Sequence, residues 1–105
     1  MGLTVFWTDF AKNELKKIHH YHRKKVSVKV AQQISTQIVE STHILNNLPE
    51  SGAIEELLQE KPQNFRYILS TNYKIIYWIN KEKNRIEVVD VFDTRQNPVK
   101  MKRNK

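Results

Sequence analysis

Hydrophobic positions divide the chain into a short strand, two helices and three closely spaced strands. Residues 3–7 are rich in Leu, Val, Phe and Trp and alternate weakly, which predicts a first strand. After Thr8 or Asp9, either of which can cap a helix, apolar side chains recur at helical spacing. We expect this helix to end near Lys25, where basic residues suit its negative end. Its apolar face comprises Ala11, Leu15, Ile18 and Tyr21.

A second, longer helix is predicted to begin at Ser27, a candidate N-cap, and to stop at Pro49 and Gly52. The polar residues Ser41 and Thr42 interrupt its apolar face. Because only a few residues separate the two helices, we expect them to pack as an antiparallel hairpin. The apolar positions of the second helix are Ala31, Ile34, Ile38, Leu45 and Leu48.

Three further strands are predicted over residues 64–70, 73–80 and 85–92. Turn signals around Asn72 and in residues 81–84 separate them, and such short connections make neighbouring strands antiparallel. The fold class is therefore α+β with the order β-αα-βββ. We expect an antiparallel meander sheet covered on one face by the helical hairpin. The other face is expected to be open, or partly open, and to be available for function.

The length of 105 residues suits one domain. We expect that domain over residues 1–99, followed by a basic flexible tail over residues 100–105. Residues 49–63 are expected to be irregular, with Leu57 and Leu58 in a short turn. The chain lacks cysteine, a signal peptide and any apolar run near the roughly 18 residues that span a bilayer. These features predict a cytoplasmic protein that does not bind a membrane.

Basic residues outnumber acidic ones by 18 to 11, which gives a formal net charge of +7. The excess is concentrated at the two ends: residues 1–39 hold seven basic and two acidic residues, and residues 94–105 hold five basic and no acidic ones. This distribution favours a polyanionic or acidic partner, such as RNA, DNA or an acidic protein segment. It also fits a protein that merely has lysine-rich exposed faces.

Metal and cofactor chemistry finds little support in the sequence. His19 and His22 can share a helix face, but no carboxylate follows at ligand spacing, so we predict no metal site. The two glycines cannot form a glycine-rich phosphate loop, and we expect no cofactor. Aromatic residues alternate along the last strands, where most should face the core although an exposed ring could stack on a base. The candidate RNA- or partner-binding residues are Tyr77, Lys100, Lys102 and Arg103.

Three cations form the candidate catalytic set: Arg66 and Lys74 on successive strands, and Arg95 just after the last strand. Together they could hold a phosphate and stabilise the charge of a transition state. Their arrangement depends on strand register. A two-residue turn at 71–72 would put Lys74 on the face opposite Arg66, whereas a longer turn or a bulge would put them side by side. The cation cluster requires the second arrangement.

Several segments resemble the RelE/ParE family of toxins from type II toxin–antitoxin systems. Residues 88–98 are similar to the family's C-terminal signature, and residues 73–77 resemble its central strand, usually Tyr-Arg followed by two aliphatic residues and Tyr. Residues 65–67 match the strand before it. The resemblance covers nearly the whole chain. It implies a compact β-αα-βββ fold and a cognate antitoxin that covers the active surface.

The resemblance implies two alternative activities. RelE-like members cut mRNA on the ribosome without a metal, by attack of a 2′-hydroxyl on the neighbouring phosphate, whereas ParE-like members inhibit DNA gyrase by binding. By position, Lys74 matches a transition-state-stabilising arginine, Arg95 matches the arginine after the last strand, and Arg66 lies where some nucleases have a catalytic lysine. Met101 stands where the nucleases carry a tyrosine or histidine, and it cannot transfer a proton.

Three hypotheses therefore stay open at the level of sequence. The cations favour a ribosome-dependent mRNA endoribonuclease, with ribosome and mRNA as partners. The missing proton-transfer residue favours a non-enzymatic inhibitor of DNA gyrase. A third hypothesis is a degenerate protein that binds its antitoxin without being toxic.

Overall fold

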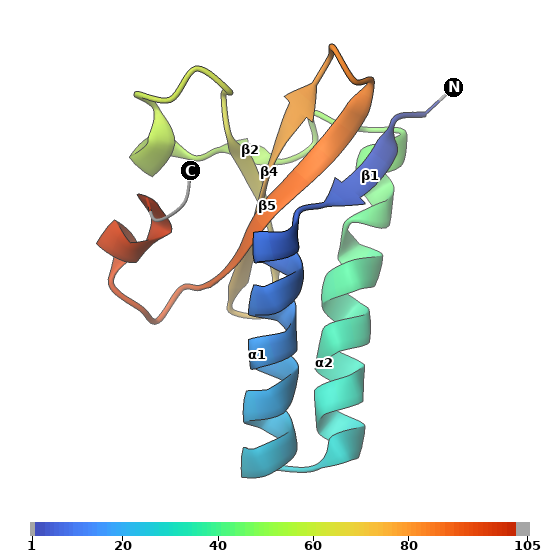
Figure 1. The fold of residues 1–105 in the computed structure, drawn as a ribbon, viewed down its shortest axis with the longest axis vertical. Helices are drawn as coiled ribbons and strands as arrows, with labels where there is room; N and C mark the ends of the chain where they lie inside the picture. Colours follow the sequence, from blue (N-terminus) through green and yellow to red (C-terminus); the bar gives the residue numbers. More distant parts are fainter. Residues whose placement is uncertain (1, 103–105) are drawn as a thin grey trace.

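The computed structural model describes residues 2–102 of the chain as an α+β fold with two helices on one side of a five-stranded sheet. In Figure 1 the two helices lie side by side, and α1 is adjacent to the sheet. The fold class predicted from the sequence is confirmed. The strands are β1 (Thr4–Trp7), β2 (Ala53–Ile54), β3 (Arg66–Ser70), β4 (Tyr73–Asn80) and β5 (Arg85–Asp93), the helices α1 (Asp9–Lys25) and α2 (Val28–Ser41), and the 3₁₀ helices η1 (His43–Asn46), η2 (Glu56–Leu58) and η3 (Pro98–Lys102).

The sheet has the order β1-β5-β4-β3-β2. β3, β4 and β5 form the predicted antiparallel meander, while β1 pairs with β5 in parallel. The short strand β2, which the sequence did not predict, pairs with β3 at the far edge. A bulge between Ile76 and Tyr77 shifts the β4–β5 register. The meander brings together the end of β3, the start of β4 and the end of β5, whereas Arg66 at the start of β3 lies at the other end of the sheet.

The helix starts follow the predicted caps. The Thr8 hydroxyl accepts a hydrogen bond from the Ala11 amide at 3.2 Å, and the Ser27 hydroxyl accepts one from the Val30 amide at 3.1 Å. Each cap satisfies an amide that lacks a partner within its helix. Both caps lie where the sequence indicated.

The end of α2 differs from the sequence prediction, because the helix stops at Ser41 rather than at Pro49. The hydroxyls of Ser41 and Thr42 both donate to backbone carbonyls of the last turn, at 2.7 Å. Such side-chain bonds compete with continued α-helix and favour its termination. The chain then tightens into η1, which keeps Leu45 buried although the α-helix has ended.

Both faces of the sheet carry a hydrophobic core, so the second face, expected to be open or partly open, is covered over part of its area, while Leu69 on it is still 59% exposed. Ala11 of α1 and Ile38 of α2 pack on the first face, together with Ile75. On the second face, η2 and η3 cover residues of β4 and β5. The buried residues of this second core are Leu58, Phe65, Ile76, Phe92 and Met101.

The C-terminal segment also differs from the predicted flexible tail. Residues 100–102 belong to η3, and Met101 is only 1% exposed. The reason is hydrophobic burial: a methionine that covers Leu58 and Phe92 loses apolar surface to the core. The rest of the predicted tail, residues 103–105, lies outside the described residues.

The β3–β4 turn contains a strained residue, Thr71, whose φ is 54°. This left-handed conformation is unfavourable for a β-branched residue but tolerated by asparagine. We expect Thr71→Asn to raise the free energy of unfolding by about 1 kcal/mol in urea denaturation. The reverse change at a similar φ, Asn84→Thr at 53°, should lower it by a similar amount. A lower urea midpoint for Thr71→Asn would contradict the strain argument.

Candidate functional site

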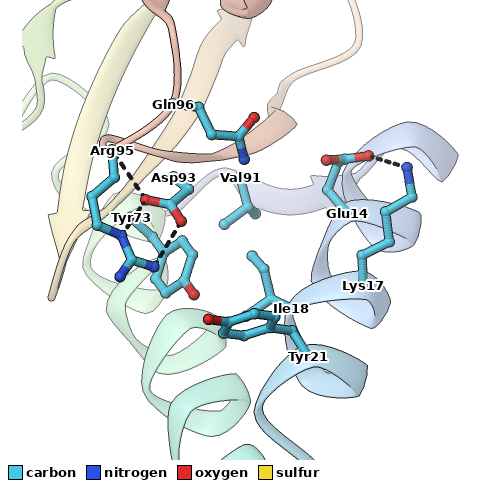
Figure 2. Close-up of a pocket in the computed structure, with 9 residues that line it drawn as sticks. All are labelled: Glu14, Lys17, Ile18, Tyr21, Tyr73, Val91, Asp93, Arg95 and Gln96. Carbon is cyan, nitrogen blue, oxygen red and sulfur yellow. Dashed lines mark hydrogen bonds and ion pairs between the residues drawn. The ribbon is translucent and has the colours of Figure 1, made fainter. Parts of the chain in front are cut away.

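A cleft of about 320 Å³ lies between α1 and the end of β5. Figure 2 shows side chains of α1 on one side and those of β4, β5 and the following turn on the other. Apolar side chains line part of it, and charged groups lie at its edges. The lining residues are Glu14, Lys17, Ile18, Tyr21, Tyr73, Val91, Asp93, Arg95 and Gln96.

Arg95 lies at this cleft in a rigid pair with Asp93. Its Nε and Nη2 donate to the two carboxylate oxygens of Asp93 at 3.0 and 2.8 Å, and its backbone amide donates to Oδ1 at 2.9 Å. These hydrogen bonds hold the pKa of Asp93 below its usual value and raise the pKa of Arg95. The Arg95 side chain is 62% exposed, so a partner can reach this oriented guanidinium.

Two tyrosines extend the cleft toward the end of α1. Tyr73 is buried, and its hydroxyl shares a 2.9 Å hydrogen bond with Nε2 of His22. Burial raises the pKa of Tyr73, and the negative charge of Asp93 adds to the effect. Tyr21 is about half exposed at the rim, and Figure 2 shows it beside Ile18. The cleft thus combines an exposed guanidinium, phenol rings and aliphatic side chains, a set typical of protein interfaces.

Lys74 lies on the opposite face of the sheet. Ser70 pairs directly with Tyr73 across a two-residue turn, so Lys74 is opposite Leu69 and shares its face. Its Nζ lies 2.8 Å from Oε2 of Glu55 and 4.2 Å from the centre of the Tyr67 ring. The Glu55 side chain is only 3% exposed, so Lys74 neutralises a buried carboxylate.

Arg66 lies away from both other cations. Its Nη1 donates to the carbonyl of Gly52 at 2.8 Å and to that of Glu50 at 3.3 Å, which ties the loop before β2 to β3. Arg66 pairs with Tyr77 of β4. Arg95 comes two residues after Asp93, the end of β5, and Asp93 pairs with Tyr73 of β4. Four residues of β4 separate these positions, a span of about 13 Å. The structure therefore does not bring Arg66, Lys74 and Arg95 together.

The remaining predicted binding residues have different surroundings. Tyr77 is fully buried, so it cannot stack on a base: its hydroxyl donates to the Pro49 carbonyl at 2.7 Å and accepts from the Gly52 amide at 3.0 Å. Lys100 is exposed on η3, and Lys102 forms a 3.2 Å ion pair with Glu60. Arg103 lies outside the described residues.

Glu55 and Asp93 are the site residues that sequence reasoning missed. The Asp93–Arg95 pair had a signal, because an aspartate two residues before an arginine at a strand end can form this turn. Glu55 had none, since its partner Lys74 is 19 residues away and Glu55 itself lies in the segment 49–63 that was expected to be irregular. Within residues 2–102, no group of three or more His, Asp or Glu side chains could hold a metal ion. No helix in the same range is long and apolar enough to cross a membrane.

Comparisons with known proteins are consistent with one fold family. The family model described as the ParE toxin of the type II toxin–antitoxin system parDE matches residues 5–98. A solved chain of the chromosomal ParDE system from P. aeruginosa aligns with a TM-score of 0.72 and 18% identity, covering 87% of this chain and 95% of the other. The isolated E. coli RelE toxin aligns with a TM-score of 0.52 and 18% identity, covering 94% and 92%.

A third solved structure contains a mutant E. coli RelE toxin in complex with a peptide of the antitoxin RelB. It aligns with a TM-score of 0.50 and 19% identity, covering 100% of this chain and 97% of the other. No curated protein sequence matches the chain. At these identities the three structures show that the fold is shared.

Proposed function

Because the chain belongs to the ParE toxin family of type II toxin–antitoxin systems, we propose that it inhibits DNA gyrase by binding rather than by cutting RNA. As a toxin of such a system, it has a cognate antitoxin as its partner. The net charge of +7 favours an antitoxin segment that carries acidic residues. The observation that carries the proposal is the separation of Arg66, Lys74 and Arg95 over two faces and two ends of the sheet.

The positions of the cations and the lack of suitable proton-transfer groups both disfavour RNA cleavage. Attack of a 2′-hydroxyl needs cations at one phosphate and groups whose pKa values lie near neutrality. Lys74 and Arg95 each pair with a carboxylate and cannot reach the same phosphate from opposite faces. At the cleft, the raised pKa of Tyr73 keeps it protonated and the lowered pKa of Asp93 keeps it ionised, so neither suits acid–base catalysis.

The cleft at Arg95 is our candidate for the surface that contacts gyrase. Arginine and tyrosine carry a large share of binding energy in protein interfaces, and Arg95 and Tyr21 are the exposed members of that class here. Asp93 fixes the guanidinium before binding, which lowers the entropy lost on association. Binding of this kind requires no chemistry from the toxin.

The test is a supercoiling assay with purified gyrase, relaxed plasmid and increasing toxin. We expect supercoiling to be lost and cleavage complexes to be trapped. The Arg95→Ala variant should require at least about tenfold more toxin for the same inhibition. Lys81→Ala, an exposed change in the β4–β5 turn, should behave as the unaltered chain.

Two outcomes would overturn the proposal. The first is normal supercoiling at saturating toxin together with mRNA fragments bearing 2′,3′-cyclic phosphate ends in a translating extract, which would instead indicate a nuclease. The second is normal growth when the chain is induced without antitoxin, which would indicate a degenerate member that only binds its antitoxin.

A further inference from the structure

The helical hairpin carries a concentration of positive charge that gyrase inhibition does not explain. Residues 15–39, which include most of both helices, contain six Lys or Arg residues, three histidines and no Asp or Glu. This stretch has no carboxylate of its own, and the acidic residues of the two helices, Asp9, Glu14 and Glu40, lie outside it. Such an unbalanced segment produces a positive local potential that attracts polyanions.

The basic residues of α1 are not spread evenly around the helix. Lys12, Lys16, His20, Arg23 and Lys24 are spaced by four, four, three and one residues, which places them on one side of an α-helix. We call these five residues the basic stripe. At 1.5 Å per residue, the stripe is about 18 Å long.

All five residues of the basic stripe are exposed. Within the described part of the chain, Lys12, Lys16 and Lys24 form no ion pair, and Arg23 contacts only the His20 ring nitrogen at 3.4 Å. An ion pair on α1 joins Lys17 to Glu14, beside the stripe. The stripe thus keeps its full charge available to a partner.

The stripe begins beside the sheet, where Lys12 and Lys16 line a shallow pocket with residues of β1, and runs away from it toward Lys24. The opposite side of α1 packs into the core through Ala11, Leu15 and Ile18, so the stripe has a rigid base. Figure 1 shows the lower halves of α1 and α2 extending beyond the strands, with the turn between the helices at the far end. An extended polyanion can therefore approach the far end of the stripe, at Arg23 and Lys24, without meeting the sheet.

We propose that the basic stripe binds the phosphate backbone of duplex DNA. The duplex carries one negative charge per about 1.7 Å of its axis, so an 18 Å stripe faces on the order of ten phosphate charges. A protein partner fits less well, because the centres of protein interfaces are depleted in charged residues and lysine, whereas four of the five stripe residues are Lys or Arg. Single-stranded nucleic acid stacks its bases on aromatics, and Tyr21 lies among the stripe residues, so the assay below compares a duplex with a single strand.

This contact goes beyond gyrase inhibition and is testable without gyrase. We would titrate the full chain into a short fluorescein-labelled DNA duplex of arbitrary sequence and follow anisotropy between about 50 and 200 mM salt. We expect the slope of log K against log salt to lie near −3.6 or steeper, since four Lys or Arg side chains contact phosphate. In Lys16→Gln/Lys24→Gln the slope should become shallower by about 1.8 and the affinity at low salt should fall at least about tenfold.

A matched control is Lys81→Gln/Lys83→Gln, which removes the same charge from the exposed β4–β5 turn. It should keep the slope and bind within about twofold of the unaltered chain, since its lysines contact no phosphate. Equal losses of affinity in both double variants would mean that binding depends only on the net charge of the protein, and this would overturn the proposal. Absence of duplex binding at low salt, or preferential binding of a single strand of equal length, would overturn it too. This experiment measures DNA binding alone. A negative result would therefore overturn the DNA contact without bearing on gyrase inhibition, which the supercoiling assay tests.

Discussion

Replacing Lys74 with alanine is expected to lower the free energy of unfolding by about 2–3 kcal/mol. The change leaves the Glu55 carboxylate, whose side chain is 3% exposed, without the ammonium group 2.8 Å away. Removing one member of a fully buried ion pair costs about 3–5 kcal/mol. We expect less here, because the Lys74 side chain is 21% exposed and water can partly replace it. Urea denaturation followed by circular dichroism measures the loss.

A double variant separates this structural role from a catalytic one. In Glu55→Gln/Lys74→Met neither charge is present, so stability should return to within about 1 kcal/mol of the unaltered chain. If Lys74 only neutralises Glu55, this variant should also keep its toxicity. A catalytic Lys74 would instead give a stable but inactive double variant. A loss below about 0.5 kcal/mol for Lys74→Ala alone would contradict the buried-pair argument.

Local features of the fold could be predicted from the sequence because their determinants lie within a few residues. The caps at Thr8 and Ser27 directly precede apolar helical patterns, and both helices begin there. The register between β3 and β4 depends on the length of the turn at residues 71–72, which the sequence left open. Once the structure gives a two-residue turn, the face occupied by Lys74 follows from alternation alone.

Non-local features could not be predicted in the same way. β2 has only two residues and no alternation to identify it, and it pairs with β3 because the loop returns there. Parallel pairing of β1 with β5 joins the two ends of the fold across most of the chain. Likewise, Met101 reads as part of a charged tail, and only the apolar surface of Leu58 and Phe92 makes its burial favourable. Long-range packing, rather than local propensity, determines the pairing of β2, the pairing of β1 and the burial of Met101.

Replacing Gly52 with alanine is expected to lower the free energy of unfolding by about 3 kcal/mol. A Cβ at this position would lie 2.6 Å from the Tyr67 carbonyl oxygen and 2.6 Å from the Tyr77 hydroxyl. Neither neighbour can move freely, since the carbonyl is backbone in β3 and the tyrosine is fully buried. The loop would have to shift, at the cost of the Gly52–Tyr77 and Arg66–Gly52 hydrogen bonds. Urea denaturation against Ser51→Ala, an exposed neighbour, measures the effect.

Tyr77→Phe tests which contact dominates at Gly52. Alone, this variant removes the acceptor of the Gly52 amide and the donor to the Pro49 carbonyl, and we expect a loss of about 1–3 kcal/mol. Combined with Gly52→Ala, it removes one of three close contacts, since the ring carbon Cε1 at 2.8 Å remains, and the double variant should be more stable than the sum of the single losses predicts. Recovery must be incomplete, because the Tyr67 carbonyl still lies within 2.6 Å. Strict additivity would mean that the Tyr77 hydroxyl does not confine this loop, and that Arg66 and the β3 backbone hold it instead.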